Sequence, residues 1–278
     1  MTVRIVTDSS CDLPQDIADS LGITIVPLSI RFGDEEFIDR TTITADEFWR
    51  RCSASAELPQ TAAPSPGQYE ETYRKLKEQG ATGIVVVALS ADLSFTIQSA
   101  DLAAKAVTGD IEVRVVDSRT ATMGLGLIAV ECAELARSGA DIDRIEALAR
   151  DHAQRIHVFG ALDTLENLKK GGRIGGAKAM LASALSIKPL IEIRGGKVEE
   201  AGKQRTRGKA LNALVEEITK AGDIERLAIL HAQCADIDDF VAKVRAVYPG
   251  EIMVGDIGAV IGTHGGRGTI GVAFRSAS

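Results

Sequence analysis

Apolar residues follow two periodicities that alternate along the first half of the chain. Short β-branched runs are typical of buried strands, and they cover residues 3–6, 23–30, 84–89 and 113–116. Between these runs, apolar residues at helical spacing predict helices over residues 13–21, 66–79, 94–106 and 124–137. Strands that alternate with helices in this way predict a doubly wound N-terminal domain around a parallel sheet.

The second half of the chain adds a hairpin to the same alternation. A predicted helix over residues 141–152 precedes a strand over 156–161, and we place a domain boundary between them, giving domains 1–153 and 154–278. Further strands are predicted at residues 187–193, 197–201, 226–231, 251–254 and 269–274, with helices at 209–221 and 237–247. Because Gly195 and Gly196 accept the positive φ of a tight turn, the first two of these strands should pair antiparallel. The C-terminal domain is therefore expected to be α/β with a mixed sheet.

Composition narrows the class of protein. A chain of 278 residues exceeds the usual size of one hydrophobic core, and 45% hydrophobic with only 4% aromatic residues indicates an aliphatic globular protein. The net charge of −7 argues against a nucleic-acid surface, which needs a dense basic face. The four cysteines form no CxxC pair and have no histidine nearby, so we expect neither a metal site nor a disulfide framework. We expect a cytoplasmic protein with at most transient contact with a membrane surface.

Three polar clusters follow predicted strands or precede predicted helices in the N-terminal half. Asp8, Ser9 and Ser10 either place hydroxyls at the carboxyl edge of the sheet, where ligands bind, or cap the next turn. Thr61 begins a loop that prolines restrain. Ser65 in this loop is the predicted helix cap, whereas Thr61 has no local role, so the Thr61 hydroxyl is available to a ligand. Ser94 precedes a helix whose free N–H groups suit an anion, although Ser94 or Asp92 could equally cap that helix.

Two glycine-rich clusters lie in the C-terminal half. Arg173 stands in the loop 168–176, where it could donate to a carboxylate or phosphate, or where the glycines merely end a helix. This loop matches neither a Walker motif nor a dinucleotide fingerprint. His264 stands in a glycine-dense turn at residues 258–268 and is either a ligand contact or a structural histidine.

In this order and spacing, the clusters resemble the DegV family, which includes the fatty-acid-binding subunit of bacterial fatty acid kinase. The matching segments are residues 8–9, 61–66, 93–100, 116–118, 170–174, 187–189 and 262–264. The resemblance implies a long-chain fatty acid between the two domains, with its carboxylate bound by Thr61 and Ser94 and near Arg173 and His264. It also implies a separate ATP-dependent kinase subunit that phosphorylates the bound acid, so this chain would be a carrier rather than an enzyme, without cofactor.

Two departures from the family pattern adjoin the implied carboxylate site, and one of them is Ile97 in place of the usual tyrosine. Phe95 replaces the usual glycine, so its backbone N–H is retained while its ring could reshape the tunnel. Arg267 adds a cation to the glycine-rich turn. A buried acyl chain also needs an apolar tunnel, for which the candidate lining residues are Ser9, Met123, Leu125, Leu127, Ile128, Met180, Leu181 and Leu185.

A basic stretch at residues 203–209 is conspicuous in an acidic chain. Lys203, Arg205 and Arg207 form either a solvated face or a docking surface for the kinase subunit. Two other functions remain open from the residues alone. One is a binding protein for another lipid, which Phe95 suggests, and the other is an enzyme acting on a small phosphorylated or carboxylated substrate, which Arg173 and His264 suggest.

Overall fold

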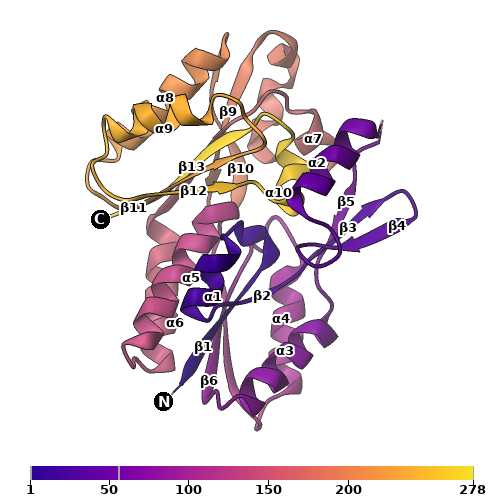
Figure 1. Cartoon of the computed structure of the whole chain (residues 1–278), viewed down its shortest axis with the longest axis vertical. Helices are drawn as coiled ribbons and strands as arrows, with labels where there is room; N and C mark the ends of the chain where they lie inside the picture. Colours follow the sequence, from indigo (N-terminus) through magenta and orange to yellow (C-terminus); the bar gives the residue numbers. More distant parts are fainter. Residues whose placement is uncertain (1, 56, 278) are drawn as a thin grey trace.

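Three β-sheets organise the chain in the computed structural model, which describes residues 2–55 and 57–277, the side chains of 183–186 excepted. The N-terminal half forms the lower part of the molecule in Figure 1 and the C-terminal half the upper part. The first sheet is parallel, in the order β2-β1-β6-β7. Its strands are β1 (Val3–Asp8), β2 (Thr24–Val26), β6 (Gly83–Ala88) and β7 (Glu112–Asp117).

Helices cover both faces of this parallel sheet, which confirms the predicted doubly wound arrangement (Figure 1). One face carries α1 (Gln15–Leu21), α5 (Thr122–Arg137) and α6 (Ile142–Arg155), and the other carries α3 (Pro66–Glu78) and α4 (Thr96–Ala106). Strand β6 is buried at every position, because a central parallel strand is covered on both faces. Helix α3 begins as predicted, with a capping box between Ser65 and Gln68 and a proline at its first position.

The C-terminal half contains a six-stranded mixed sheet in the order β10-β9-β8-β13-β11-β12. Its strands are β8 (Ile156–Ala161), β9 (Lys188–Arg194), β10 (Lys197–Gln204), β11 (Ile224–His231), β12 (Ile252–Asp256) and β13 (Ile270–Ser276). Helices α8 (Arg207–Lys220) and α9 (Ile237–Arg245) pack against each other, and α8 packs on this sheet. The predicted β9–β10 hairpin is confirmed, with φ of +59° at Gly195 and +88° at Gly196 in its turn. The boundary near residue 153 stays a prediction.

Helix α5 joins the two sheets because it contacts strands of both. It is buried from Thr122 to Ala133, as expected for a helix that is apolar on all sides. Close packing requires small residues here, since a Cβ at Gly124 would lie 2.5 Å from a methyl group of Val158. A buried ion pair adds to this junction, because Arg275 of β13 donates to Glu131 of α5 at 2.7 Å.

Two parts of the fold differ from the sequence prediction. The strand predicted over residues 23–30 is two strands, because Pro27 has no N–H to donate and the chain leaves the parallel sheet there. Strand β3 (Ser29–Phe32) joins β4 (Glu35–Ile38) and β5 (Gln60–Ala62) in a small antiparallel sheet, which with α2 (Ala45–Ala54) was not predicted. The prediction of a glycine-dense turn over residues 258–268 was wrong in part, because residues of this segment form the helix α10 (Ala259–Gly265).

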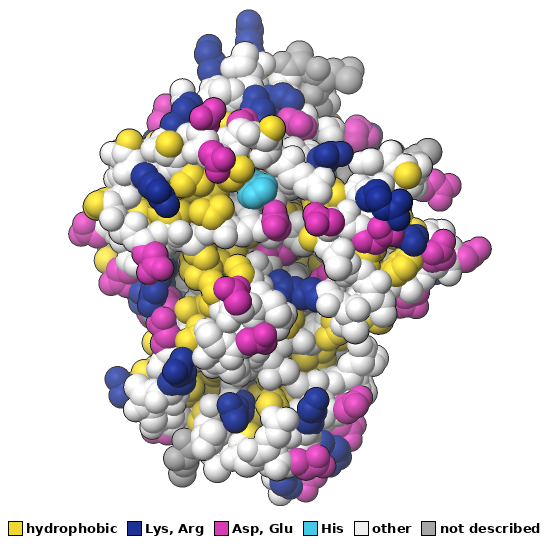
Figure 2. Space-filling model, viewed as in Figure 1, with side chains coloured by type: hydrophobic (Ala, Val, Ile, Leu, Met, Phe, Trp, Pro, Cys, Tyr) yellow, Lys and Arg dark blue, Asp and Glu magenta, His cyan; other side chains and the backbone are white. Residues whose placement is uncertain are grey.

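Charges of both signs are intermingled over the face of the molecule shown in Figure 2, without a continuous basic region. Across residues 2–55 and 57–277, we find no helix that combines the length and the apolar character needed to cross a membrane. The remaining short elements are η1 (Ser9–Cys11), α7 (Glu166–Lys170) and η2 (Gly175–Ser186).

Candidate functional site

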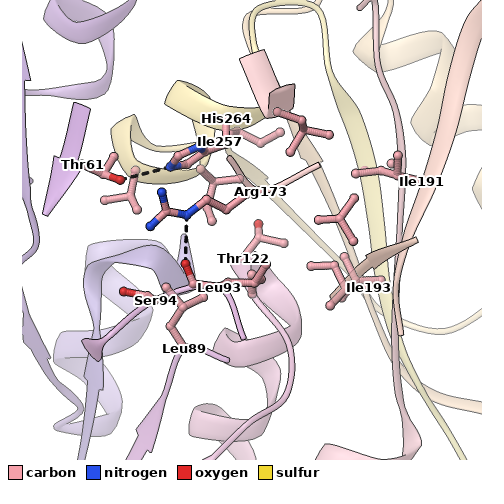
Figure 3. Close-up of a pocket in the computed structure, with 18 of the residues that line it drawn as sticks. Thr61, Leu89, Leu93, Ser94, Thr122, Arg173, Ile191, Ile193, Ile257 and His264 are labelled. Atoms are coloured by element: carbon pink, nitrogen blue, oxygen red, sulfur yellow. Dashed lines mark hydrogen bonds between the residues drawn. The ribbon is translucent and has the colours of Figure 1, made fainter. Parts of the chain in front are cut away.

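A cavity of about 370 Å³ lies between the N-terminal and C-terminal halves of the chain. Its walls are mostly aliphatic side chains from both halves, including Leu28, Leu89, Ile191, Ile193, Ile257 and Val260. Figure 3 shows Ile191 and Ile193 of β9 on one side and polar side chains gathered on the other. The cavity therefore has an apolar body and one polar end, as expected for a site that binds an amphiphile.

Four residues form the polar end of the cavity, and each comes from a different segment. Thr61 lies on β5, Ser94 in the loop before α4, Arg173 in the loop after α7, and His264 on α10. The structure thus brings together the four side chains that the resemblance implied for a carboxylate. Among the described residues that line the cavity, Arg173 is the one with a permanent charge.

His264 is held against Thr61 and is uncharged near neutral pH. Its Nε2 lies 3.0 Å from the Thr61 Oγ1. Burial lowers its pKa to about 4, and the positive charge of Arg173 acts in the same direction. Its Nδ1 is buried without a hydrogen-bond partner among the described residues. Because a buried N–H without an acceptor is rarer than a buried acceptor without a donor, we assign the proton to Nε2, which leaves the Thr61 hydroxyl proton for a ligand.

Ser94 has a comparable supporting residue in Thr96. The Ser94 Oγ lies 2.9 Å from the Thr96 Oγ1 and accepts from the Thr96 backbone N–H at 3.3 Å. The N-cap residue of α4 is Phe95 rather than Ser94, so the Ser94 hydroxyl supports the residue that opens the helix without being its cap, and Ser94 also lines the cavity. Thr96 was missed by the sequence analysis, although the Ser-x-Thr spacing before a helix is a visible signal.

Arg173 is a fixed cation because two backbone carbonyls hold its guanidinium. Its Nε donates to the Leu93 carbonyl at 3.1 Å and its Nη1 donates to the Gly171 carbonyl at 2.7 Å. Figure 3 shows the guanidinium between Thr61 and Ser94. These acceptors are neutral, so the positive charge at this end of the cavity is not cancelled by a bonded carboxylate.

Gly171 allows His264 to take its position. A Cβ built on Gly171 would lie 2.3 Å from the His264 Nδ1, a distance that no side chain can tolerate. The φ of Gly171 is −75°, so the glycine is needed for close approach rather than for an unusual backbone conformation. The glycine of this loop therefore positions the histidine and, through it, the Thr61 hydroxyl.

Phe95 lies at the mouth of the cavity. Its side chain lines the cavity and is nevertheless 68% exposed, so the ring does not fill the interior. The added cation Arg267 points elsewhere, since its Nη1 donates to the Ser53 hydroxyl at 3.1 Å. Of these two residues, Phe95 lines the cavity and Arg267 does not.

Several residues predicted to line a tunnel do not line the cavity. The prediction that Ser9 lines the tunnel is corrected, because its buried hydroxyl accepts from the Leu28 backbone N–H at 3.1 Å and so supports the fold. Asp8 likewise caps η1 and accepts from the Leu89 N–H at 2.8 Å. The other residues pack in apolar clusters behind the cavity wall, namely Met123, Leu125, Leu127, Ile128, Met180 and Leu181. The side chain of Leu185 lies outside the described residues.

Asp12 and Thr122 form a junction at the cavity wall that the sequence analysis missed. Asp12 accepts from the Thr122 hydroxyl at 2.7 Å and from the Gly258 N–H at 3.0 Å, and Thr122 lines the cavity. Burial raises the pKa of Asp12 to about 7. No local pattern links residues so distant in sequence, so this junction had no signal to find.

Two of the three candidate docking residues are free to meet a partner. Lys203 and Arg205 are exposed. The prediction of Arg207 as a docking residue is corrected, because its guanidinium donates to Asp236 at 2.6 Å and to the Gly268 carbonyl at 2.6 Å. A side chain held by a bidentate ion pair is committed to the fold of this chain.

The fold and the cavity define a two-domain α/β protein of the ligand-binding class, with an apolar cavity between its halves. The family model "Uncharacterised protein, DegV family" matches residues 2–277, and the chain belongs to the DegV family. A DegV domain-containing protein of Streptomyces coelicolor is 38% identical over 99% of this chain and 98% of its own length.

Solved structures of similar proteins share the whole fold. A fatty-acid-binding DegV family protein from Thermus thermophilus is 33% identical, with a TM-score of 0.90 over 99% of this chain and 100% of its own. A stearic acid-binding protein from Eubacterium ventriosum is 25% identical, with a TM-score of 0.91 over 98% of each chain. The similarity to these two structures therefore covers all the segments that build the cavity.

Proposed function

We propose that this protein binds a long-chain fatty acid in the cavity and presents its carboxylate to a separate ATP-dependent kinase subunit, which forms an acyl phosphate. The observation that carries the proposal is the fixed charge of Arg173, beside the hydroxyls of Thr61 and Ser94, at one end of a mainly aliphatic cavity. Fatty acid binding by the Thermus relative and stearic acid binding by the Eubacterium relative support the same ligand class.

The apolar body supplies most of the driving force in this proposal. Each buried methylene contributes roughly 0.8 kcal/mol, so a tail of about fifteen carbons supplies on the order of 10 kcal/mol before the cost of ordering. A carboxylate buried without partners would cancel much of this gain. Hydrogen bonds from Thr61 and Ser94 and the charge of Arg173 offset that cost.

The polar end is suited to holding a carboxylate without altering it. Thr61 donates its hydroxyl proton with His264 behind it, and Ser94 donates with Thr96 behind it. The backbone N–H of Phe95 adjoins the same end. In the proposal, this chain binds and orients the acid, and the kinase subunit supplies the nucleotide and the phosphoryl transfer. Lys203 and Arg205 are the cations proposed for salt-sensitive docking.

Thermal unfolding of delipidated protein with palmitate or oleate tests the binding. Ligand that binds only the folded state stabilises it by RT ln(1 + [L]/Kd), or about 2.7 kcal/mol at a ligand concentration of about 100 Kd. The double variant Thr61→Ala, Ser94→Ala should lose most of the shift while remaining folded. An unchanged shift in the double variant removes the carboxylate assignment. A shift with other lipids and none with fatty acids would indicate a different ligand class.

Presentation to a kinase has its own test. Fatty-acid-loaded protein mixed with ATP and the kinase subunit should give an acyl phosphate, which hydroxylamine traps as the hydroxamate. The Lys203→Ala, Arg205→Ala variant should bind fatty acid normally and give less product at low salt, whereas Arg226→Ala, at a cation already paired with Glu134, is the matched control. Hydrolysis of a phosphate ester by the protein alone, abolished by His264→Ala, would instead support an enzyme.

A further inference from the structure

A second cavity of about 510 Å³ adjoins the polar end of the first. Thr61, Arg173 and His264 line both cavities, so these three side chains form the partition between them. The other residues of this outer cavity include Glu57, Gln60, Asn167, Lys170 and Thr263. The inner cavity is mainly aliphatic, whereas the outer cavity is polar, and this change suits a ligand with an apolar chain inside and a strongly hydrated group outside.

The outer cavity carries more positive than negative charge. Arg173 and Lys170 are cations, Glu57 is the one acidic residue of its described lining, and His264 is neutral near pH 7. Lys170 is exposed and has no ion-pair partner within residues 2–55 and 57–277. Arg173 is bonded to carbonyls alone through its Nε and Nη1. Two cations without a bonded carboxylate therefore face the same space.

We propose that the outer cavity is a phosphate site, which holds the phosphoryl group of an acyl phosphate between Lys170 and Arg173. This inference rests on the proposed function and adds a site to it. A carboxylate has a single negative charge, which Arg173 matches. An acyl phosphate carries about two charges on three terminal oxygens, and Lys170 is the second cation that such a group requires.

The chemistry of the transfer places the new group on the outer side of the partition. A carboxylate oxygen attacks the terminal phosphorus of a nucleoside triphosphate supplied with the kinase, a C–O–P linkage forms, and the nucleoside diphosphate leaves with the electrons of the broken P–O bond. No proton is consumed. The acyl carbon stays beside Thr61 and Ser94, so the phosphorus must lie beyond them, where the outer cavity begins. Glu57 opposes the new charge and limits how tightly the product is held.

A stable mimic tests the site without the kinase. The probe is 2-oxoheptadecylphosphonate, whose keto group replaces the acyl carbonyl and whose phosphonate replaces the phosphoryl group, and palmitate is the comparison ligand. Lys170→Ala should bind the phosphonate about fivefold more weakly at low salt, as expected for one partly exposed charge pair, and bind palmitate like wild type. Glu57→Gln should bind the phosphonate more tightly and palmitate unchanged.

Lys169→Ala is the matched control, because Lys169 is exposed and lines neither cavity. Wild-type phosphonate affinity should fall with added salt more steeply than that of Lys170→Ala. The phosphate site is overturned if wild type and Lys170→Ala bind the phosphonate with equal affinity. It is also overturned if Lys170→Ala loses as much affinity for palmitate as for the phosphonate, or if Lys169→Ala loses as much phosphonate affinity as Lys170→Ala. Failure of palmitate to bind wild type is a different result, because it overturns the proposed function and the inference with it.

Discussion

Replacement of Thr61 by valine isolates the hydroxyl on which the carboxylate assignment depends. The change keeps the size and branching of the side chain and removes a group that lies 3.0 Å from the His264 Nε2. A hydrogen bond to a charged group is worth about 1.5–3 kcal/mol, so fatty acid affinity should fall by about one to two orders of magnitude. The apolar chain remains bound by the aliphatic walls, so binding is weakened rather than lost.

The variant should also lose some stability without ligand. Removal of the hydroxyl leaves the buried Nε2 of His264 without its partner, a cost of about 1–3 kcal/mol. Fluorescence displacement with palmitate measures affinity, and urea unfolding measures stability. Thr219→Val on α8 is the control, because the hydroxyl of that exposed threonine donates to the Val215 carbonyl and the residue lines neither cavity.

The methyl ester of palmitate separates the head group from the chain. The ester has the same tail but no charge, so wild type should bind it more weakly than the acid, and Thr61→Val should discriminate less between the two. Wild-type affinity of Thr61→Val for palmitate would refute a contact between the Thr61 hydroxyl and the carboxylate. An equal loss of affinity for acid and ester would also refute it, since the hydroxyl would then serve the cavity wall and not the carboxylate.

Three further predictions concern the neighbours of Thr61. Gly171→Ala should push His264 away, lowering stability by about 1–3 kcal/mol and weakening palmitate binding, and unchanged binding would contradict the positioning role. Phe95→Ala should speed transfer of fatty acid to vesicles in stopped-flow measurements, whereas Leu102→Ala, 55% exposed on helix α4 that follows Phe95, should not. The pKa of His264 is about 4 when folded and near 6.5 when unfolded, so the contribution of His264 to the free energy of unfolding is complete above pH 6.5 and falls by about 2–3 kcal/mol towards pH 4. Urea unfolding at several pH values should show that the free energy of unfolding of wild type, relative to that of His264→Asn, falls between pH 6.5 and pH 4, and a constant difference would contradict the shifted pKa.

Much of the fold follows from local pattern. The strand over 156–161 was predicted at its observed bounds, and the glycine pair of the β9–β10 hairpin was identified from turn chemistry alone. The small sheet of β3, β4 and β5 was not, because its short strands are partly exposed and lack a clear alternation. Pro27 was the available signal that the strand over 23–30 is interrupted, since a proline disfavours the interior of a sheet.

In the site too, the residues that lie in local motifs could be predicted, whereas contacts between distant segments could not. Thr61, Ser94, Arg173 and His264 were identified through motifs that resemble a family pattern, and each lies in a loop or short element whose role is visible locally. The contact between Gly171 and His264 was not predictable, because it depends on how the loop after α7 packs against α10. The prediction of the tunnel-lining residues was wrong for a related reason, because aliphatic composition cannot distinguish a cavity wall from the core behind it.

The most direct measurement of the central claim is mass spectrometry of the purified protein after denaturation and extraction. Long-chain fatty acid should be released in an amount close to one molecule per chain, and the Thr61→Ala, Ser94→Ala variant should release much less. A preparation that yields no fatty acid and that then fails to bind added palmitate or oleate would contradict the account.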